Sequence, residues 1–309
     1  MLFNLGIVFQ ILRQSILNRI QLYDIIINER NDYIMYIDFH VHAFADNIAE
    51  RAMSKLSATA EKTGLKPVTD GTIAGLKNKL TECNISGAVL LPVATKPSQQ
   101  TTINNWAASQ NNGFFYSFGS VHPMAEEVFE ELERIKDLGL YGIKLHPDYQ
   151  DFYVDDENVI PVYKKCAELD LPVLIHSGYD PLSPDNIHCM PDAAARAFDR
   201  VPQMTMILAH GGSMYKWDLV EEYLAGKKGN LFFDVSVIAG QISQEQLTRI
   251  IKKHGADRIL FGSDCPWDTP LNEIKMINAL NISDEEKELI FYKNAEKLLG
   301  IKKPRSQCR

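Results

Sequence analysis

The chain has 309 residues, of which 45% are hydrophobic and 23% are charged. This is the balance of an ordinary globular protein, and it excludes a fibrous or fully disordered chain. The formal net charge of −8 argues against a nucleic-acid partner, because proteins that bind nucleic acids usually present a basic face. A chain of this length could form two domains, but α/β barrels of this size routinely fold as one, and we expect one.

The first 34 residues differ in character from the rest of the chain. Polar and charged residues interrupt their apolar runs well short of the roughly 18 apolar residues that a membrane-spanning helix needs. We therefore predict no membrane partner, and the segment also lacks the features of a secretory signal. Because Met35 directly precedes the first expected strand, we interpret residues 1–34 as an appended segment or a mis-assigned translation start. A single domain over 35–300 and a tail over 301–309 follow.

The five cysteines are scattered along the chain, odd in number and without a C-x-x-C pair. This pattern indicates reduced thiols rather than a disulfide framework. We therefore expect a cytoplasmic protein.

From Met35 onward, short apolar runs of strand character alternate with stretches of helical periodicity. The expected strands are 35–41, 87–93, 114–120, 142–145, 172–175, 205–209, 231–235 and 258–261. The expected helices are 49–63, 73–82, 103–111, 125–138, 159–169, 192–200, 218–224, 244–254 and 284–299. This alternation is typical of parallel strands that are buried on both faces.

Side chains of the kind that bind metals follow several of these strands at the point where each strand ends. His40 and His42 close the first strand, and the alternation of side chains along a strand sends both to the same side. His176, His210 and Asp264 follow later apolar runs in the same way. Five such groups at strand ends predict one shared site.

The spacing of these residues indicates which strands carry them. A strand and its returning helix take about 30 residues or more. The successive intervals from His42 to His176, to His210 and to Asp264 are about 134, 34 and 54 residues. The groups would then end strands 1, 5, 6 and 8 of a (β/α)8 TIM barrel, a fold of about 250 residues. A doubly wound sheet is the alternative, but it would hold strands 1 and 8 apart.

Imidazole nitrogen and carboxylate oxygen suit a divalent ion, zinc first and manganese or iron next, and the absence of thiolate ligands argues against a closed structural zinc site. Three histidines and one aspartate leave a coordination position for water or substrate. A bound divalent ion can lower the pKa of its water to about 7. One His-x-His pair alone is weak evidence of a metal site, but the joint occurrence of all these groups at C-terminal strand ends favours a catalytic centre.

Six motifs occur in an order that resembles the amidohydrolase superfamily, specifically its amidohydrolase-related (type 2) branch. They are Asp38-Phe-His-Val-His42, Gly142-Ile-Lys-Leu-His-Pro147, Pro172-Val-Leu-Ile-His-Ser-Gly178, Ile207-Leu-Ala-His-Gly-Gly212, Leu260-Phe-Gly-Ser-Asp264 with Pro266-Trp267, and Asn294-Ala-Glu-Lys-Leu-Leu-Gly300. The similarity covers roughly residues 35–300.

The resemblance implies a role for each strand-end residue. His40, His42, His176 and Asp264 match the metal ligands, commonly of zinc, and His210 matches the catalytic histidine beside them. Members of this branch include hydrolases of amides and lactones, and also nonoxidative decarboxylases and hydratases. The family therefore leaves the reaction open.

Three further residues are predicted to bind substrate. Lys144 and His146, two apart on the fourth strand, should point the same way and hold a substrate carboxylate or carbonyl. Two other roles stay open for Lys144: a carboxylated lysine that bridges two metals, as in some superfamily members, and an ion pair with a barrel carboxylate. His188 lies in the long loop 179–190, which could close as a lid over the barrel mouth and bring His188 to the substrate.

Our first hypothesis is a metal-dependent hydrolase of a small amide, lactone or ester. A metal-activated water would attack, Asp264 would assist proton transfer, and His210 would stabilise or protonate the developing charge. The alternative is a nonoxidative decarboxylase of an unsaturated or aromatic acid, which needs a cation near the metal; Lys144 and Arg51 are the candidates. An inactive metal-binding barrel ranks third. The expected partner is a small-molecule substrate, and a homodimer is suggested by fold analogy alone.

Overall fold

The computed structural model describes residues 35–60 and 64–302. The predicted N-terminal segment 1–34 lies outside these residues, and so does most of the predicted tail 301–309. The domain predicted over 35–300 is described except for residues 61–63.

Parallel strands form the centre of the described chain. They are β1 (Tyr36–Val41), β2 (Ile85–Leu90), β3 (Phe115–Ser117), β4 (Ile143–Leu145), β5 (Val173–Ile175), β6 (Met206–Leu208), β7 (Leu231–Asp234) and β8 (Ile259–Leu260). Strands that follow one another in the chain pair in parallel, within β1–β3 and again within β4–β8. Nearly all strand residues are buried, as expected for strands covered on both faces.

Backbone hydrogen bonds join the two sheets into one closed barrel. Between β3 and β4, the Lys144 N–H donates to the Gly119 carbonyl at 2.8 Å. Between β8 and β1, the Asp264 N–H donates to the His40 carbonyl at 2.8 Å. The first and last strands are therefore neighbours, which confirms the (β/α)8 barrel prediction and excludes the doubly wound alternative.

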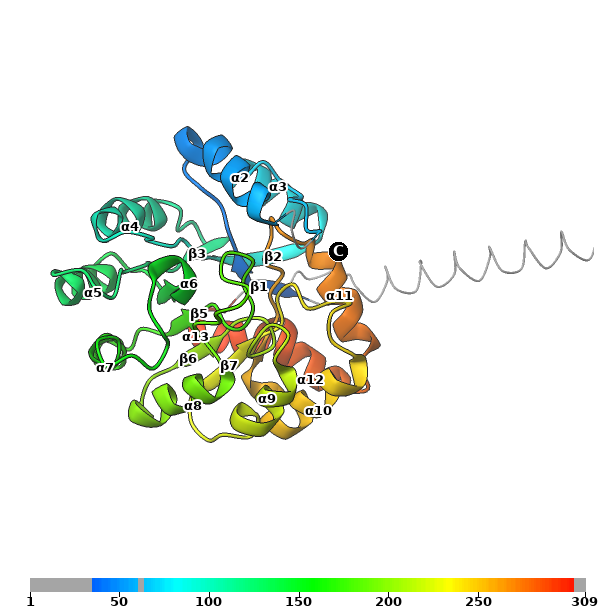
Figure 1. Ribbon diagram of the computed structural model, residues 1–309. Helices are drawn as coiled ribbons and strands as arrows, with labels where there is room; N and C mark the ends of the chain where they lie inside the picture. The colour runs from blue at the N-terminus through cyan, green and yellow to red at the C-terminus, as the bar shows by residue number, and fades with distance from the viewer. Residues whose placement is uncertain (1–34, 61–63, 303–309) are drawn as a thin grey trace, which may run out of the picture. The chain divides into compact units, whose positions relative to one another are not determined.

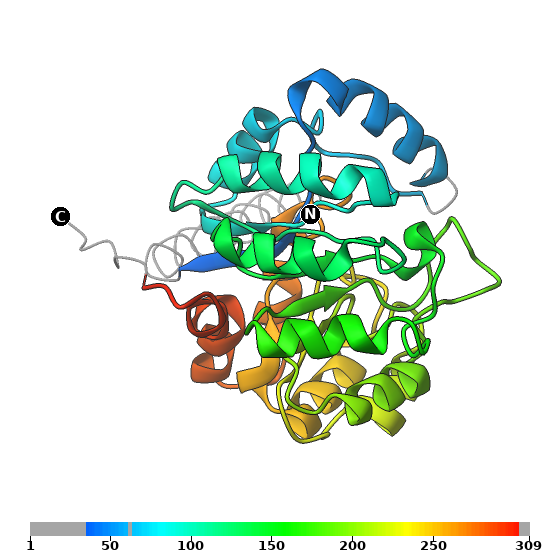
Figure 2. The same ribbon diagram turned by 90° about the vertical axis from the view of Figure 1, so that its left-hand side faces the viewer.

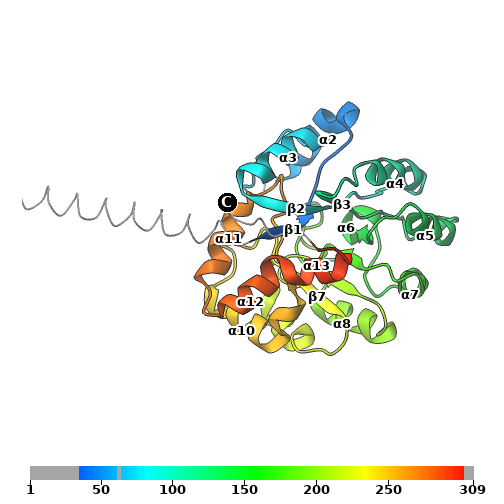
Figure 3. The ribbon, with the colours of Figure 1, turned by 180° about the vertical axis from the view of Figure 1, so that it is seen from behind.

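Helices surround the strands on the outside of the barrel (Figure 1). They are α2 (Asp46–Ala60), α3 (Ile73–Glu82), α4 (Gln100–Ser109), α5 (Val128–Asp137), α6 (Pro147–Gln150), α7 (Ile160–Glu168), α8 (Pro191–Arg200), α9 (Trp217–Leu219), α10 (Gln244–His254), α11 (Pro270–Ala279), α12 (Asp284–Glu288) and α13 (Asn294–Leu299), with the shorter turns η2 (Pro97–Gln99), η3 (Val220–Leu224), η4 (Ala256–Arg258) and η5 (Leu289–Lys293). The side view shows α4, α5 and α7 lying next to one another along the outer surface (Figure 2). Seen from behind, the red helix α13 lies against β1 and β8 (Figure 3).

Helix α10 illustrates how the sequence specifies these outer helices. It begins after Ser243, whose hydroxyl accepts a hydrogen bond from the Gln246 N–H at 3.1 Å. Its buried residues include Leu247 and Ile251, which are four apart and so face the barrel from one side. The helix ends at Gly255, whose φ of 105° is costly for any residue with a Cβ.

Several segments differ from the helices expected from the sequence, among them 218–224, which is a short α9 followed by the π turn η3. The predicted helix 284–299 is divided by the π-helical turn η5, in which Ile290, Phe291 and Tyr292 are all buried and contact β1 and β8 as a group. Helix α6 is four residues long, too short to produce a periodic signal. Helix α11 was not predicted, although Pro270 at its first position is a start signal.

Two further features concern the described residues only. None of their helices is long and apolar enough to cross a membrane. Four cysteines, Cys83, Cys166, Cys189 and Cys265, are buried and form no disulfide, and Cys308 lies outside the described residues.

Candidate metal centre

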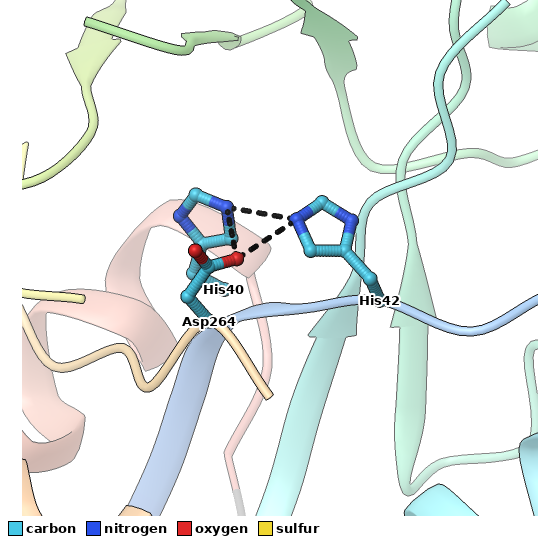
Figure 4. Close-up of side chains that lie close together, drawn as sticks. All are labelled: His40, His42 and Asp264. Atoms are coloured by element: carbon cyan, nitrogen blue, oxygen red, sulfur yellow. Dashed lines mark hydrogen bonds and ion pairs between the residues drawn. The ribbon is translucent and has the colours of Figure 1, made fainter. Parts of the chain in front are cut away.

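Three of the predicted metal ligands converge at the carboxyl end of the barrel strands. His40 lies in β1, His42 lies one residue beyond it, and Asp264 follows β8 (Figure 4). The Nε2 atoms of His40 and His42 are 3.1 Å apart, and Asp264 Oδ1 lies 3.1 Å from His42 Nε2 and 3.5 Å from His40 Nε2. Atoms that bind one ion at about 2.0–2.2 Å are separated by roughly 3–3.5 Å, so these three side chains fit a divalent ion.

The outer nitrogen of each histidine is held by a fixed acceptor. His40 Nδ1 lies 2.9 Å from Asp234 Oδ2, and His42 Nδ1 lies 2.7 Å from the Leu91 carbonyl. Both contacts favour a proton on Nδ1 and leave a lone pair on Nε2. In metal-binding histidines, a hydrogen bond from the ring nitrogen that does not bind the metal holds the other nitrogen in one orientation.

Asp234, at the end of β7, belongs to the candidate site and was missed by the sequence reasoning. Burial would raise the pKa of its carboxyl group, but His40 and His210 hold that pKa below its usual range. Ser236 donates its hydroxyl hydrogen to Asp234 Oδ1 at 2.6 Å. The sequence could have indicated this residue, because Asp234 ends the seventh apolar run in the same way that Asp264 follows the eighth.

Lys144 is the cation nearest to this group in the described geometry. It lies in β4, is 1% exposed, and its Nζ is 3.2 Å from His40 Nε2. Burial lowers the pKa of Lys144 to about 8, against the opposing effect of Asp234 and Asp264. Burial thus makes the charged form of this side chain less favourable than it would be in water. Arg51, the other cation considered from the sequence, lies exposed on α2 and is not part of this group.

His210 is buried next to the three converging side chains. Its ring centre is 5.4 Å from that of His40, and its Nδ1 is 3.1 Å from the Ser236 carbonyl. Its backbone φ is 61°, and that of Asp264 is 62°, a left-handed conformation uncommon outside glycine. Strained backbone of this kind is concentrated at functional sites.

His176, the fourth predicted ligand, lies on the other side of His210. Its Nδ1 is 3.0 Å from His210 Nε2. Its ring stacks on that of His146, with centres 4.1 Å apart. The structure thus brings His40, His42 and Asp264 into one group of ligand atoms and places His176 in a second group, with His146 and Asp180.

The two other predicted substrate-binding residues occupy different surroundings. His146 lies in the second group and is stacked between His176 and Tyr149. His188 is buried, with Nδ1 3.1 Å from the Pro147 carbonyl and Nε2 3.1 Å from the Asn186 side-chain nitrogen. It belongs to neither group, and its role in substrate binding stays a prediction.

Burial sets the charge of the histidines at this end of the barrel. Burial and the nearby Lys144 lower the pKa of His40 to about 4, although Asp234 and Asp264 oppose this shift. The pKa of His176 is lowered well below its usual value, chiefly by burial. Neutral imidazoles are the form that binds metals.

Comparison with known proteins places this chain among relatives of known activity. A gamma-resorcylate decarboxylase from Rhizobium sp. is 25% identical over 215 residues, which are 56% of this chain and 65% of that protein. A 2-keto-4-carboxy-3-hexenedioate hydratase from Sphingobium sp. is 27% identical over 205 residues, which are 54% of this chain and 59% of that protein. The matched region is thus less than two thirds of the length of either relative.

A solved structure shares the fold at low sequence identity. It is the 5-carboxyvanillate decarboxylase from Novosphingobium aromaticivorans, complexed with manganese and 4-hydroxy-3-methoxy-5-nitrobenzoic acid. The two chains superpose with a TM-score of 0.64 and 18% identity, over 87% of this chain and 97% of the other. The amidohydrolase family model matches residues 37–301, the whole barrel from β1 to the end of α13. This chain is a member of the amidohydrolase family.

Proposed function

We propose that the protein is a metal-dependent nonoxidative decarboxylase of an unsaturated or aromatic acid. The observation that carries this proposal is the buried Lys144 ammonium group, 3.2 Å from His40 Nε2. Hydrolysis of a neutral amide, lactone or ester does not call for a fixed cation there, whereas a carboxylate substrate does. The decarboxylases among the relatives support the same choice over hydrolysis, which the sequence alone put first.

His40, His42 and Asp264 are the residues proposed to hold the divalent ion, with His176 as the predicted fourth ligand. When bound, the ion supplies Lewis-acid polarisation of a substrate oxygen. The donor set of imidazole nitrogen and carboxylate oxygen suits manganese as well as the zinc favoured by the sequence. The manganese bound to the Novosphingobium enzyme supports a divalent ion and does not favour zinc.

Lys144 is the residue proposed to bind the substrate carboxylate or a neighbouring oxygen. Because its side chain is buried, an ion pair formed there is screened far less than one at the surface. Its buried position in β4 would fix the carboxylate relative to the ion. Such positioning is a major part of catalysis for bound reactants.

The reaction requires one proton per turnover. The bond between the substrate carbon and its carboxylate breaks, carbon dioxide leaves, and the electron pair stays on carbon until a proton arrives. Asp264 and His210 are the two residues proposed to take part in this transfer, and solvent restores the proton afterwards. No water enters the product, which separates this reaction from hydrolysis.

Isotope labelling tests the proposal. The manganese-loaded protein is incubated with gamma-resorcylate, 5-carboxyvanillate and a set of unsaturated dicarboxylates, esters, lactones and amides. We expect carbon dioxide release from an acid and one deuterium on the product carbon when the reaction runs in D2O. Incorporation of ¹⁸O from labelled water without carbon dioxide would instead establish hydrolysis or hydration. A metal-replete protein that is silent with every class would favour the inactive barrel.

A further inference from the structure

Trp217, the first residue of α9, lies against the backbone of His210. It is 6% exposed, and its indole N–H donates to the His210 carbonyl at 3.0 Å. We propose that Trp217 is a positioning residue, which fixes the backbone of His210 and thereby holds the imidazole where it can transfer a proton. This inference rests on the proposed function, in which His210 takes part in the proton transfer.

The backbone at His210 has a conformation that its neighbours must hold in place. Its φ is 61°, in the left-handed region that costs energy for a residue with a Cβ. The peptide unit that follows His210 is hydrogen-bonded at both edges. The Gly211 N–H donates to the Asp234 carbonyl at 2.6 Å, and the His210 carbonyl accepts from Trp217 at 3.0 Å. Trp217 therefore supplies one of the two contacts that set the orientation of this peptide unit.

The orientation of the backbone decides where the His210 ring can lie. The His210 N–H donates to Asp234 Oδ1 at 3.1 Å, so both peptide units that flank the Cα atom are fixed, and with them the direction of the Cβ atom. The ring can then turn only about its own two side-chain bonds. Its Nδ1 lies 3.1 Å from the Ser236 carbonyl and 3.0 Å from the Ser236 hydroxyl, which restrict that turning. A tilted peptide unit would move the ring away from both contacts.

The close approach at Gly211 is a second observation that ties Trp217 to this backbone. Gly211 has a φ of 69°, and a Cβ atom built on it would lie 2.9 Å from Trp217 Nε1. A side chain at this position would push the indole away from the His210 carbonyl. Gly240 is also left-handed, with a φ of 77°, but a Cβ atom there meets no described atom within 4 Å. The crowding at Gly211 thus comes from Trp217 and not from the left-handed backbone itself.

Nuclear magnetic resonance of the full-length protein, labelled with ¹⁵N at histidine, tests the positioning without any substrate. The ring signals of His210 are identified by their loss in His210→Asn, and circular dichroism verifies folding. We expect these signals to shift or disappear in Trp217→Phe, which keeps an aromatic ring and removes the N–H. Trp106→Phe, on the outer helix α4, is the matched control and should leave them unchanged. Unchanged His210 signals in Trp217→Phe would overturn the proposal, whether or not the protein decarboxylates an acid.

A glycine pair repeats this test without altering the tryptophan. Gly211→Ala should change the His210 ring signals as Trp217→Phe does, because the added methyl group displaces the indole. Gly240→Ala imposes a similar backbone cost in open space and should leave the signals unchanged. The same His210 signals in both glycine variants would overturn the proposal. This pair also keeps the test available if Trp217→Phe fails to fold.

Kinetics then connect the position of the ring with the reaction. With the acid that the native protein decarboxylates, we expect kcat of Trp217→Phe to fall by about 10- to 100-fold, while KM and the manganese content change less than about twofold. In an equal mixture of H2O and D2O, the ratio of hydrogen to deuterium in the product should shift from the native value toward that of His210→Asn. This ratio does not depend on how much protein is active, so a folding defect would leave it unchanged. A native ratio in Trp217→Phe, with a changed ratio in His210→Asn, would overturn the role of Trp217 and leave the proposed function standing.

Discussion

The ligand groups at the two sides of the barrel mouth differ in how their outer atoms are held. At β1 and β8, the outer nitrogens of His40 and His42 contact fixed acceptors, and the ligand atoms are 3.1–3.5 Å apart. At β4 and β5, Asp180 Oδ2 lies 3.6 Å and 3.8 Å from the Nε2 atoms of His146 and His176, and several polar atoms have no partner among the described residues. The first group is thus held in place by contacts within the protein, whereas several polar atoms of the second group have no such contact among the described residues.

The two groups differ in this way because their residues come from different kinds of structural element. His40 lies in a core strand, and Asp264 is tied to it by a backbone hydrogen bond of 2.8 Å. In the second group, Asp180 comes from the connection between β5 and α8, where backbone position is set by local turns rather than by a ladder. A preorganised site binds its ion more tightly, because less ordering is required on binding. We therefore expect the first group to bind its ion tightly.

Asp264→Asn should produce the largest effect. It removes a ligand oxygen and a proposed proton carrier, so we expect decarboxylation to fall by about a thousandfold or more and the ion of the first group to bind weakly. Turnover and manganese content are measured together. Asp199→Asn, which removes an exposed carboxylate that pairs with Lys227, is the control and should leave both unchanged. Near-normal turnover in Asp264→Asn would remove the first group from the catalytic centre.

Lys144→Met should reduce kcat/KM for a carboxylate substrate by about a hundredfold, because a buried charge partner is lost. The volume of the side chain is nearly kept, so the barrel should stay folded. The matched control is Lys165→Met, which removes an exposed lysine paired with Glu133. If Lys144→Met behaves like this control, Lys144 does not bind the carboxylate and the decarboxylase proposal loses its main support.

Asp234→Asn tests whether the contact behind His40 organises the first group. An amide can present its nitrogen to His40 Nδ1 and favour the wrong tautomer, so we expect metal affinity at the first group to fall by about 10- to 100-fold. Unchanged metal affinity in Asp234→Asn would show that this contact does not organise the first group.

The smallest expected effect concerns His254, whose protonation changes the free energy of unfolding. This change should not depend on bound metal. It is buried at the end of α10, and burial lowers its pKa to about 4, below its value in the unfolded chain. The unfolded state therefore binds the proton more readily, so the stabilisation is complete above about pH 6.5 and is lost as pH falls toward 4. We expect the free energy of unfolding to fall by roughly 1–2 kcal/mol between pH 7 and pH 5 from this group.

His254→Gln should flatten this part of the stability profile, measured by urea unfolding at several pH values. Metal-loaded and metal-free protein should show the same change, because His254 contacts the Leu231 carbonyl and Phe233 and belongs to neither ligand group. An unchanged slope in His254→Gln would assign the acid sensitivity to the metal-binding histidines instead.

Much of the fold could be predicted from the chain itself. The alternation of apolar runs and helical stretches yields the eight strands in the correct order, and β1 begins within one residue of its expected start. The short helix α6 was missed, because a four-residue helix has no period. The helix predicted over 284–299 is correct in place, but its interruption by the π turn η5 was not predicted. The π turn packs against β1 and β8, which the local sequence does not reveal.

The candidate site was predicted only in part. Strand alternation correctly joined His40 and His42, and the strand count brought Asp264 to them. Asp180 could not be foreseen, because nothing in the local pattern of a connecting segment indicates which way its side chain will point. Asp234 could have been noticed, since it ends a strand like the other site residues.

The amino-acid order alone determined the barrel, the strand ends that carry reactive side chains, and the kind of ion they suit. Hydrophobic periodicity and residue chemistry are local properties, so they can be read from the sequence without knowing which residues are in contact in the folded chain. Only the folded chain decided that His176 turns toward His146 and Asp180, and that Lys144 lies against His40. Those choices depend on which hydrogen bonds and buried charges can be satisfied together in space, and no single stretch of sequence contains that information.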